Sequence, residues 1–291
     1  MKLKRKISPK IKKIFKWISL TLVALTVIFF WGGEIQNILR EDSEEEYYEE
    51  KESYQDEWQD CDIAVIKLQG NLYTYIPVAD KDADGYPLYD EISSEDIVYE
   101  IEQAETDDDI KAIILEIDST GGAPVAAEEV ANALQRATKL TVALIRESGA
   151  SAAYYAASGA DIIFASENSD VGSIGVTTSY VSNSDKNQKE GLMYNQLIAG
   201  KFKDMGNPDK ILTSEEKRLI MRDIKIVHEN FIKTVAENRD LEIDKVRKLA
   251  DGSSMLGQMA LENGLIDKIG GLDEVMEYLL GKFDEGIKAC W

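Results

Sequence analysis

Histidine, cysteine and proline are scarce in this chain of 291 residues, which contains one, two and five of them respectively. There is no Cys-x-x-Cys motif and no Cys/His cluster, so a zinc site is not expected. The one histidine, His228, lies inside a long amphipathic stretch without a nearby turn signal, and we expect it on a helix surface. A Ser-His-Asp triad is therefore not expected. A P-loop is also missing, and the sequence predicts no bound cofactor.

Basic residues are outnumbered by acidic ones. The chain has 33 Lys and Arg against 54 Asp and Glu, which gives a net charge of −21 and a pI of about 4.5. Nucleic-acid binding needs a basic surface, so nucleic acid is not expected as a partner. The plain alternative is that the acidity serves solubility.

The positive charge that is present gathers at the N-terminus. Residues 1–16 hold eight Lys or Arg and no acidic residue, whereas residues 17–33 hold no charge and are mostly apolar. Seventeen such residues reach the lower limit for crossing a bilayer. We predict a cytoplasmic basic segment at 1–16 and an uncleaved transmembrane anchor at 17–33, which places the rest outside the cytoplasm. A cleavable signal peptide is the alternative, but the small-residue cleavage pattern is missing.

An acidic stretch follows the predicted anchor. Residues 41–60 contain eleven Asp or Glu and one Lys, a composition that repels itself and cannot form a core. We predict a solvated tether at 34–61, with an acidic docking segment as the alternative. The folded domain is predicted at 62–283 and a short tail at 284–291. Cys61 and Cys290 flank this domain, and the sequence leaves open whether they form a disulfide or stay as thiols.

Strand-like and helix-like segments alternate in the predicted domain. Apolar, β-branched runs predict strands at 63–68, 112–117, 141–145, 161–165, 173–177 and 193–198. Helical spacing of apolar residues predicts helices at 94–104, 124–137, 151–158, 213–238, 243–250, 256–263 and 272–280. The alternation predicts an α/β domain with a mostly parallel sheet and a helical C-terminal portion.

Ser151 is the strongest candidate for a reacting group. It follows a strand-like run and the small residues Gly149 and Ala150, and it precedes a short helical segment. The free N–H groups at a helix start can stabilise a developing anion, and small neighbours let a substrate approach. The alternative is that the hydroxyl only caps the helix.

A nucleophilic serine needs a base, and histidine is not a good candidate in this chain. A lysine amine can serve where its surroundings lower its pKa. Lys203 lies in a glycine-containing loop, Gly200-Lys-Phe-Lys-Asp204, between a predicted strand and the helix at 213–238. Lys201 in the same loop is the rival.

Four short motifs occur in a fixed order. They are Ala150-Ser-Ala-Ala-Tyr-Tyr155, Gly172-Ser-Ile-Gly-Val176, the Gly200–Asp204 loop, and Gly257-Gln-Met-Ala-Leu-Glu-Asn-Gly-Leu-Ile-Asp267. Together they make residues 62–280 resemble the signal peptide peptidase A family of membrane-bound serine peptidases. The resemblance implies the fold shared by Clp peptidase and the crotonases.

The resemblance also implies roles for individual residues. Ser151 corresponds to the nucleophile, Lys203 to the general base, and Ser173 to a serine that orients the lysine. The N–H groups of Gly122 and Ala152 correspond to the oxyanion donors. Two positions differ from the family pattern: Thr120 replaces a proline, and Ala152-Ala153 replaces Gly-Gly, which narrows the space beside the serine.

The resulting functional prediction is a membrane-anchored, ATP-independent serine endopeptidase that degrades small membrane-derived peptides such as cleaved signal peptides. The resemblance implies a homo-oligomer at the cell membrane, and its active sites can be shared between copies. Two alternatives remain open: a crotonase-like acyl-CoA enzyme, and a scaffold that binds peptides without cutting them.

Overall fold

The computed structural model describes residues 61–76, 90–283 and 286–291. The predicted basic segment and membrane anchor, and nearly all of the predicted tether, lie outside the described residues. Within the part of the chain that is described, no helix combines the length and apolar character needed to cross a membrane.

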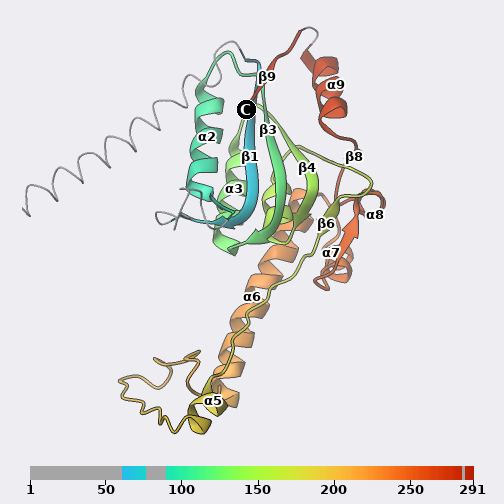
Figure 1. Cartoon of the computed structure of the whole chain (residues 1–291). Helices are drawn as coiled ribbons and strands as arrows, with labels where there is room; N and C mark the ends of the chain where they lie inside the picture. Colours follow the sequence, from blue (N-terminus) through green and yellow to red (C-terminus); the bar gives the residue numbers. More distant parts are fainter. Residues whose placement is uncertain (1–60, 77–89, 284–285) are drawn as a thin grey trace, which may run out of the picture. The chain divides into compact units, whose positions relative to one another are not determined.

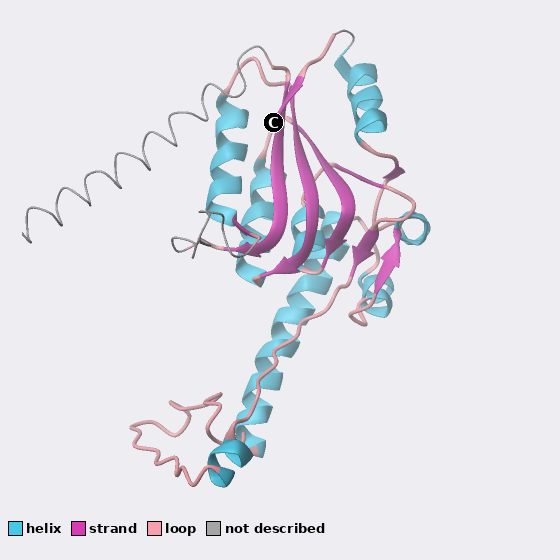
Figure 2. Ribbon diagram, in the orientation of Figure 1, coloured by secondary structure: helices cyan, strands magenta, loops and turns pink. Residues whose placement is uncertain are grey.

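A mostly parallel sheet forms the centre of the domain (Figure 2). Its order is β2-β1-β3-β4-β5-β8, and every pair along this path is parallel. The strands of this path are Glu91–Ser93, Ile63–Tyr73, Ala112–Gly122, Leu140–Ala150, Ile162–Ala165 and Lys268–Ile269. Three short strands lie outside this path: β6 (Asp170–Gly172) pairs with β4, β7 (Ser254–Leu256) pairs with β6, and β9 (Ala289–Cys290) pairs with β1. The predicted α/β class with a mostly parallel sheet is confirmed.

All of the described helices except α5, which was not predicted, begin and end close to the predicted residues (Figure 1). The described helices are α2 (Ser94–Thr106), α3 (Pro124–Arg136), α4 (Ala152–Ala157), α5 (Ser184–Lys189), α6 (Ser214–Asn238), α7 (Ile243–Leu249), α8 (Gly257–Asn263) and α9 (Leu272–Phe283). Local chemistry explains the starts. Ser93 caps α2, Pro124 is the first residue of α3, and Thr213 with Glu216 forms a capping box at α6.

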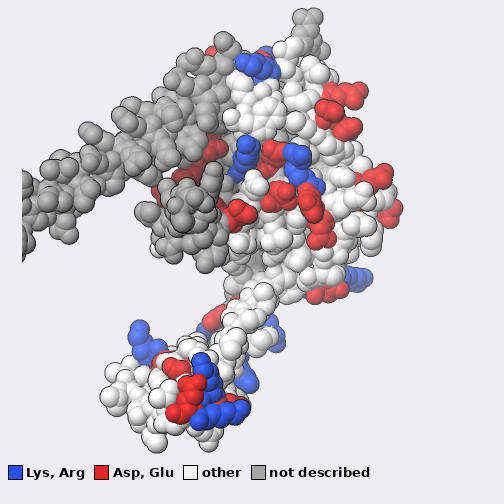
Figure 3. Space-filling view, in the orientation of Figure 1, with Lys and Arg blue, Asp and Glu red and all other residues white. Residues whose placement is uncertain are grey.

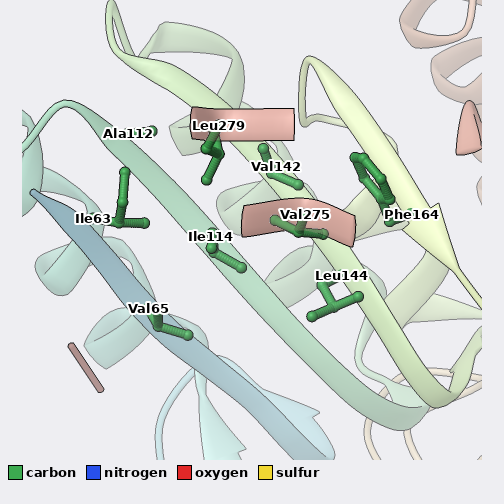
Figure 4. Close-up of a cluster of buried hydrophobic side chains, with 9 residues drawn as sticks. All are labelled: Ile63, Val65, Ala112, Ile114, Val142, Leu144, Phe164, Val275 and Leu279. Atoms are coloured by element: carbon green, nitrogen blue, oxygen red, sulfur yellow. The ribbon is translucent and has the colours of Figure 1, made fainter. Parts of the chain in front are cut away.

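Burial on both faces of the sheet explains why its central strands are continuous apolar runs. Residues 112–115 of β3 and 142–145 of β4 are buried at every position. On one face, α9 contributes Val275 and Leu279 to a cluster with strand residues (Figure 4). The strand residues in that cluster are Ile63, Val65, Ala112, Ile114, Val142, Leu144 and Phe164.

Two predicted strands are wrong. Residues 173–177 form no strand, because β6 ends at Gly172 and Ser173 adopts a positive φ of 50°, which turns the chain out of the ladder. Residues 193–198 also lack strand structure. Met193 and Leu197 are 82% and 95% exposed, so this apolar run lies on the surface and has no neighbouring strand to pair with. Apolar composition alone gave the wrong assignment there.

The two ends of the domain are joined. Cys61 and Cys290 form a disulfide with their Cα atoms 6.0 Å apart, which resolves the alternative that the sequence left open. Next to it, the Asp62 carboxylate accepts hydrogen bonds from the Lys111 amine and from the Lys288 backbone N–H. These two bonds lower the pKa of Asp62, with the Lys111 bond as the larger cause.

Candidate active site

Ser151 lies at the junction between β4 and α4 in a strained conformation. Its φ and ψ are 53° and −123°, a region that a residue with a side chain rarely adopts. Its backbone N–H donates to the Gly172 carbonyl at 2.7 Å, and its carbonyl accepts from the Tyr155 N–H at 3.0 Å. These two bonds hold the strained residue in place.

The Ser151 hydroxyl does not cap the helix. Ser151 occupies the N-cap position of α4, yet its side chain makes no capping hydrogen bond. The alternative that the serine serves only as a helix cap is therefore wrong. The N–H of Ala152, the first residue of α4, is among the amides that a helix leaves unpaired at its start.

A glycine turn approaches Ser151 closely. A Cβ built on Gly121, whose φ is +120°, would lie 2.9 Å from the Ser151 Cβ and 3.0 Å from the Ala152 nitrogen. A Cβ on Gly122 would collide with the backbone of Leu72, because β3 pairs with β1 at this point. Only glycine fits at either position, so the turn can lie directly against the serine.

A cavity of about 340 Å³ opens beside the serine. Three predicted site residues line it together: Gly122, Ser151 and Ala152. Its other walls are mostly apolar or neutral, and come from α3, α4, α6 and the segment after β6. Those residues are Pro124, Val125, Glu128, Tyr155, Gly175, Val176, Thr177, Val227, Asn230 and Phe231.

Aromatic and polar contacts fix the inner wall. The Tyr155 ring lies 5.0 Å from the Phe231 ring between centroids, and its hydroxyl shares a 3.0 Å hydrogen bond with Thr234. Burial raises the pKa of Tyr155 above its usual value, with smaller contributions from Glu128 and Glu237. The phenol therefore stays neutral and attached to α6.

The pairing of β4 with β6 places Ser173 close to this site. Ala150 and Gly172 are paired residues of β4 and β6, so Ser151 and Ser173 each follow a paired position. Adjacent strands are about 4.8 Å apart. The Ser173 hydroxyl donates to the Gly252 carbonyl at 3.0 Å, which uses its hydrogen and leaves lone pairs that can accept from an amine.

Lys203 does not join the site within this chain. It is exposed, in a loop that belongs to a projecting arm, residues 178–212, at the far end of α6 (Figure 1). The arm is held to the first turn of α6, where Lys201 pairs with Glu215 and Lys210 pairs with Glu216. The cavity residues of α6 begin at Val227, twelve residues further along, which is about 18 Å of helix.

Hydrogen bonds centred on Asp204 shape the lysine loop. Its carboxylate accepts from the Tyr194 hydroxyl, from the Gln196 amide at 3.2 Å and from the Asn207 amide at 2.9 Å. The bond to Asp204 raises the pKa of Tyr194 to about 12, and in return the pKa of Asp204 is lowered. Lysines and acidic residues lie close together on the surface of this arm (Figure 3).

Two other features do not belong to the site. His228 lies half-buried on α6 and is not among the cavity residues, so the structure gives no support for a histidine base. A larger cleft of about 510 Å³ lies over the sheet and is lined by charged residues such as Lys67 and Asp118. Ser151 does not line that cleft, and its Arg146 and Glu116 already pair with each other.

The sequence did not reveal the cavity walls on α3 and α6. The helices themselves were predicted, but Glu128, Val227 and Phe231 carry no motif. Their convergence on Ser151 depends on how α3 and α6 pack around α4. The i, i+4 spacing of Pro124 and Glu128 was the one available sign that both lie on one helix face.

Comparison with known proteins finds similarity to peptidases. The sequence model of Peptidase family S49 matches residues 133–282. A putative protease of Methanocaldococcus jannaschii is 34% identical over 181 residues, 62% of this chain and 58% of that protein. A putative signal peptide peptidase SppA of Enterococcus faecium is 28% identical over 262 residues, 89% of this chain and 70% of that protein. Protease 4 of Haemophilus influenzae is 27% identical over 219 residues, 74% of this chain and 34% of that protein.

Proposed function

The chain belongs to peptidase family S49, and we propose that it is a serine-type peptidase with Ser151 as nucleophile and Lys203 of a neighbouring copy as general base. The observation that carries the proposal is the uncapped hydroxyl of a strained Ser151 beside a cavity. Strain held by surrounding hydrogen bonds is common at catalytic residues. The matched region 133–282 includes Ser151, Ser173 and Lys203.

The proposed reaction begins when the Lys203 amine accepts the hydroxyl proton and the Ser151 oxygen attacks a peptide carbonyl. The N–H groups of Gly122 and Ala152 donate to the resulting oxyanion, and one such donor is typically worth about 2.7–4 kcal/mol. Collapse of the intermediate breaks the C–N bond, and the lysine returns the proton to the leaving amine. Water, activated by the same amine, then hydrolyses the acyl-enzyme.

Ser173 is proposed to orient the lysine. Its hydroxyl hydrogen is engaged by Gly252, so its oxygen can accept a hydrogen bond from an amine that enters the site. This arrangement leaves a lone pair of the amine for the proton of Ser151. Ser173 would then act through Lys203 without touching the substrate.

The geometry of one chain supports the proposal of a second copy. Among the described residues that line the cavity there is no Lys, Arg or His, while the loop with Lys203 is about 18 Å away along α6. A general base has to come within about 3 Å of the proton it removes. We therefore propose a homo-oligomer in which the arm of one copy, residues 178–212, reaches the cavity of the next.

The finer proposals concern setting and substrate. The Enterococcus relative is named a putative signal peptide peptidase, and the chain spans 58% and 70% of the first two relatives described. We propose membrane-derived peptides, including cleaved signal peptides, as substrates, cleavage independent of ATP, and the fold of Clp peptidase and the crotonases. Residues 17–33 are the proposed single membrane anchor, with the peptidase domain outside the cytoplasm.

Cleavage of a peptide carrying a fluorescent reporter, by the purified full chain, tests this proposal. Ser151→Ala and Lys203→Ala should each lower kcat/KM by at least about 100-fold, the usual contribution of a nucleophile or general base. Lys201→Ala is the matched control, because it removes an amine from the same loop, one that pairs with Glu215 of α6, and it should stay near wild type. Activity that persists in either main variant would refute the assigned roles.

A further inference from the structure

The cavity beside Ser151 contains one charged side chain. Among the thirteen residues that line it, Glu128 is the only one with an ionisable carboxylate, and none is cationic. Apolar side chains of Val125, Val227 and Phe231 surround much of the remaining space. A single carboxylate in a largely apolar cavity is the kind of polar group that sets ligand orientation and specificity.

The helix geometry of α3 directs Glu128 towards the cavity. Pro124 and Glu128 are four residues apart and therefore share a helix face, and both line the cavity. Glu129, the next residue, lies on another face, where its carboxylate accepts a 2.5 Å hydrogen bond from Ser94 on α2. Glu129 thus ties two helices together, whereas Glu128 makes no ion pair with any residue in the described part of the chain.

Tyr155, on the inner wall of the cavity, lies within electrostatic range of Glu128. The hydroxyl of Tyr155 is affected electrostatically by Glu128 and Glu237, both of which disfavour its ionised form. Glu128 lines the cavity from α3, and Glu237 is an exposed residue of α6. Both carboxylates therefore contribute negative potential at the end of the cavity near Tyr155, and this contribution favours a cation over an anion.

From these contacts we propose that Glu128 is a specificity-determining residue that selects peptides with a lysine or arginine side chain close to an apolar one. The methylene groups of such a side chain can lie along the apolar walls while its charged end reaches the carboxylate. The inference rests on the proposed peptidase function, and it adds a substrate class to it: basic-apolar peptides.

The test compares peptides that differ by one charge. Each reporter peptide has leucine on the N-terminal side of the scissile bond. One of the three preceding positions at a time carries lysine, its uncharged analogue norleucine, or glutamate. kcat/KM is measured for wild type, Glu128→Gln, Glu128→Lys and the control Glu102→Gln. Glu102 is an exposed residue of α2 outside the cavity lining, so its substitution removes the same charge elsewhere.

At one or more positions, wild type and Glu102→Gln should prefer lysine over norleucine by about fivefold, the factor expected for a solvent-accessible ion pair. The preference should disappear in Glu128→Gln, turn towards glutamate in Glu128→Lys, and weaken in high salt. A lysine preference that survives in Glu128→Gln, or wild type without any such preference, would overturn this inference and leave the peptidase function intact. If wild type cleaves none of the peptides, the proposed function fails as well.

Discussion

An active site shared between copies predicts that two inactive variants restore each other. Ser151→Ala retains Lys203 but has no nucleophile, and Lys203→Ala retains the nucleophile but has no base. In one chain the lysine loop is about 18 Å along α6 from the cavity, whereas proton transfer needs contact within about 3 Å. Each variant alone should therefore be inactive, and a mixed oligomer should contain working sites.

The size of the recovery follows from random assembly. In an equal mixture, half of the cavities have an intact Ser151 and half of the neighbouring arms have an intact Lys203, so about one quarter of the sites are complete in a ring of head-to-tail contacts. Recovered kcat per site should approach this fraction. KM should stay unchanged, because a complete site is made of the same residues as in wild type.

The assay uses co-expression of the two variants with different affinity tags, purification through both tags, and cleavage of a reporter peptide. Ser151→Ala co-expressed with the double variant Ser151→Ala/Lys203→Ala is the control, and it should remain inactive because no copy has the nucleophile. If the mixed oligomer is as inactive as its parents, Lys203 does not act across copies, and the proposed role of the arm is wrong.

The remaining predictions concern stability. Replacing Cys61 and Cys290 by serine removes a cross-link over 229 residues and should lower the free energy of unfolding in urea by about 2–5 kcal/mol, and added reductant should not change that variant further. Because the pKa of Asp62 is lowered in the folded state, its contribution is complete above the reference pKa of 3.8 and is lost as pH falls through the lower folded value; Asp62→Asn should flatten the decline of Tm between about pH 4 and 2. Gly281→Ala, where a Cβ meets no atom within 4 Å in α9, should stabilise by about 0.4–1 kcal/mol. Gly122→Ala should instead destabilise and inactivate, because its Cβ collides with backbone; an equally stable, active Gly122→Ala would contradict the close approach of β3 and β1.

Local sequence signals were sufficient where structure depends on neighbouring residues. Ser93, Pro124 and Thr213 set helix starts through their own side chains or ring, and these starts were predicted to within a residue. Local sequence signals failed for the apolar runs at 173–177 and 193–198, which were predicted as strands and are not strands. An apolar run becomes a strand only when a partner strand lies beside it, and partner position is not encoded locally.

The sequence by itself determined the alternation of strands and helices and the mostly parallel sheet, because periodicity reports directly on local structure. Its turn chemistry pointed to Ser151, and the resemblance to a peptidase family selected Lys203 over Lys201. Tertiary structure decided the rest. It brought Gly122 and Ser173 close to Ser151 through strand pairing, built the cavity from α3, α4 and α6, and kept Lys203 on an arm away from it. Contacts between residues distant in sequence depend on how whole helices and strands pack, and local sequence patterns do not specify that packing.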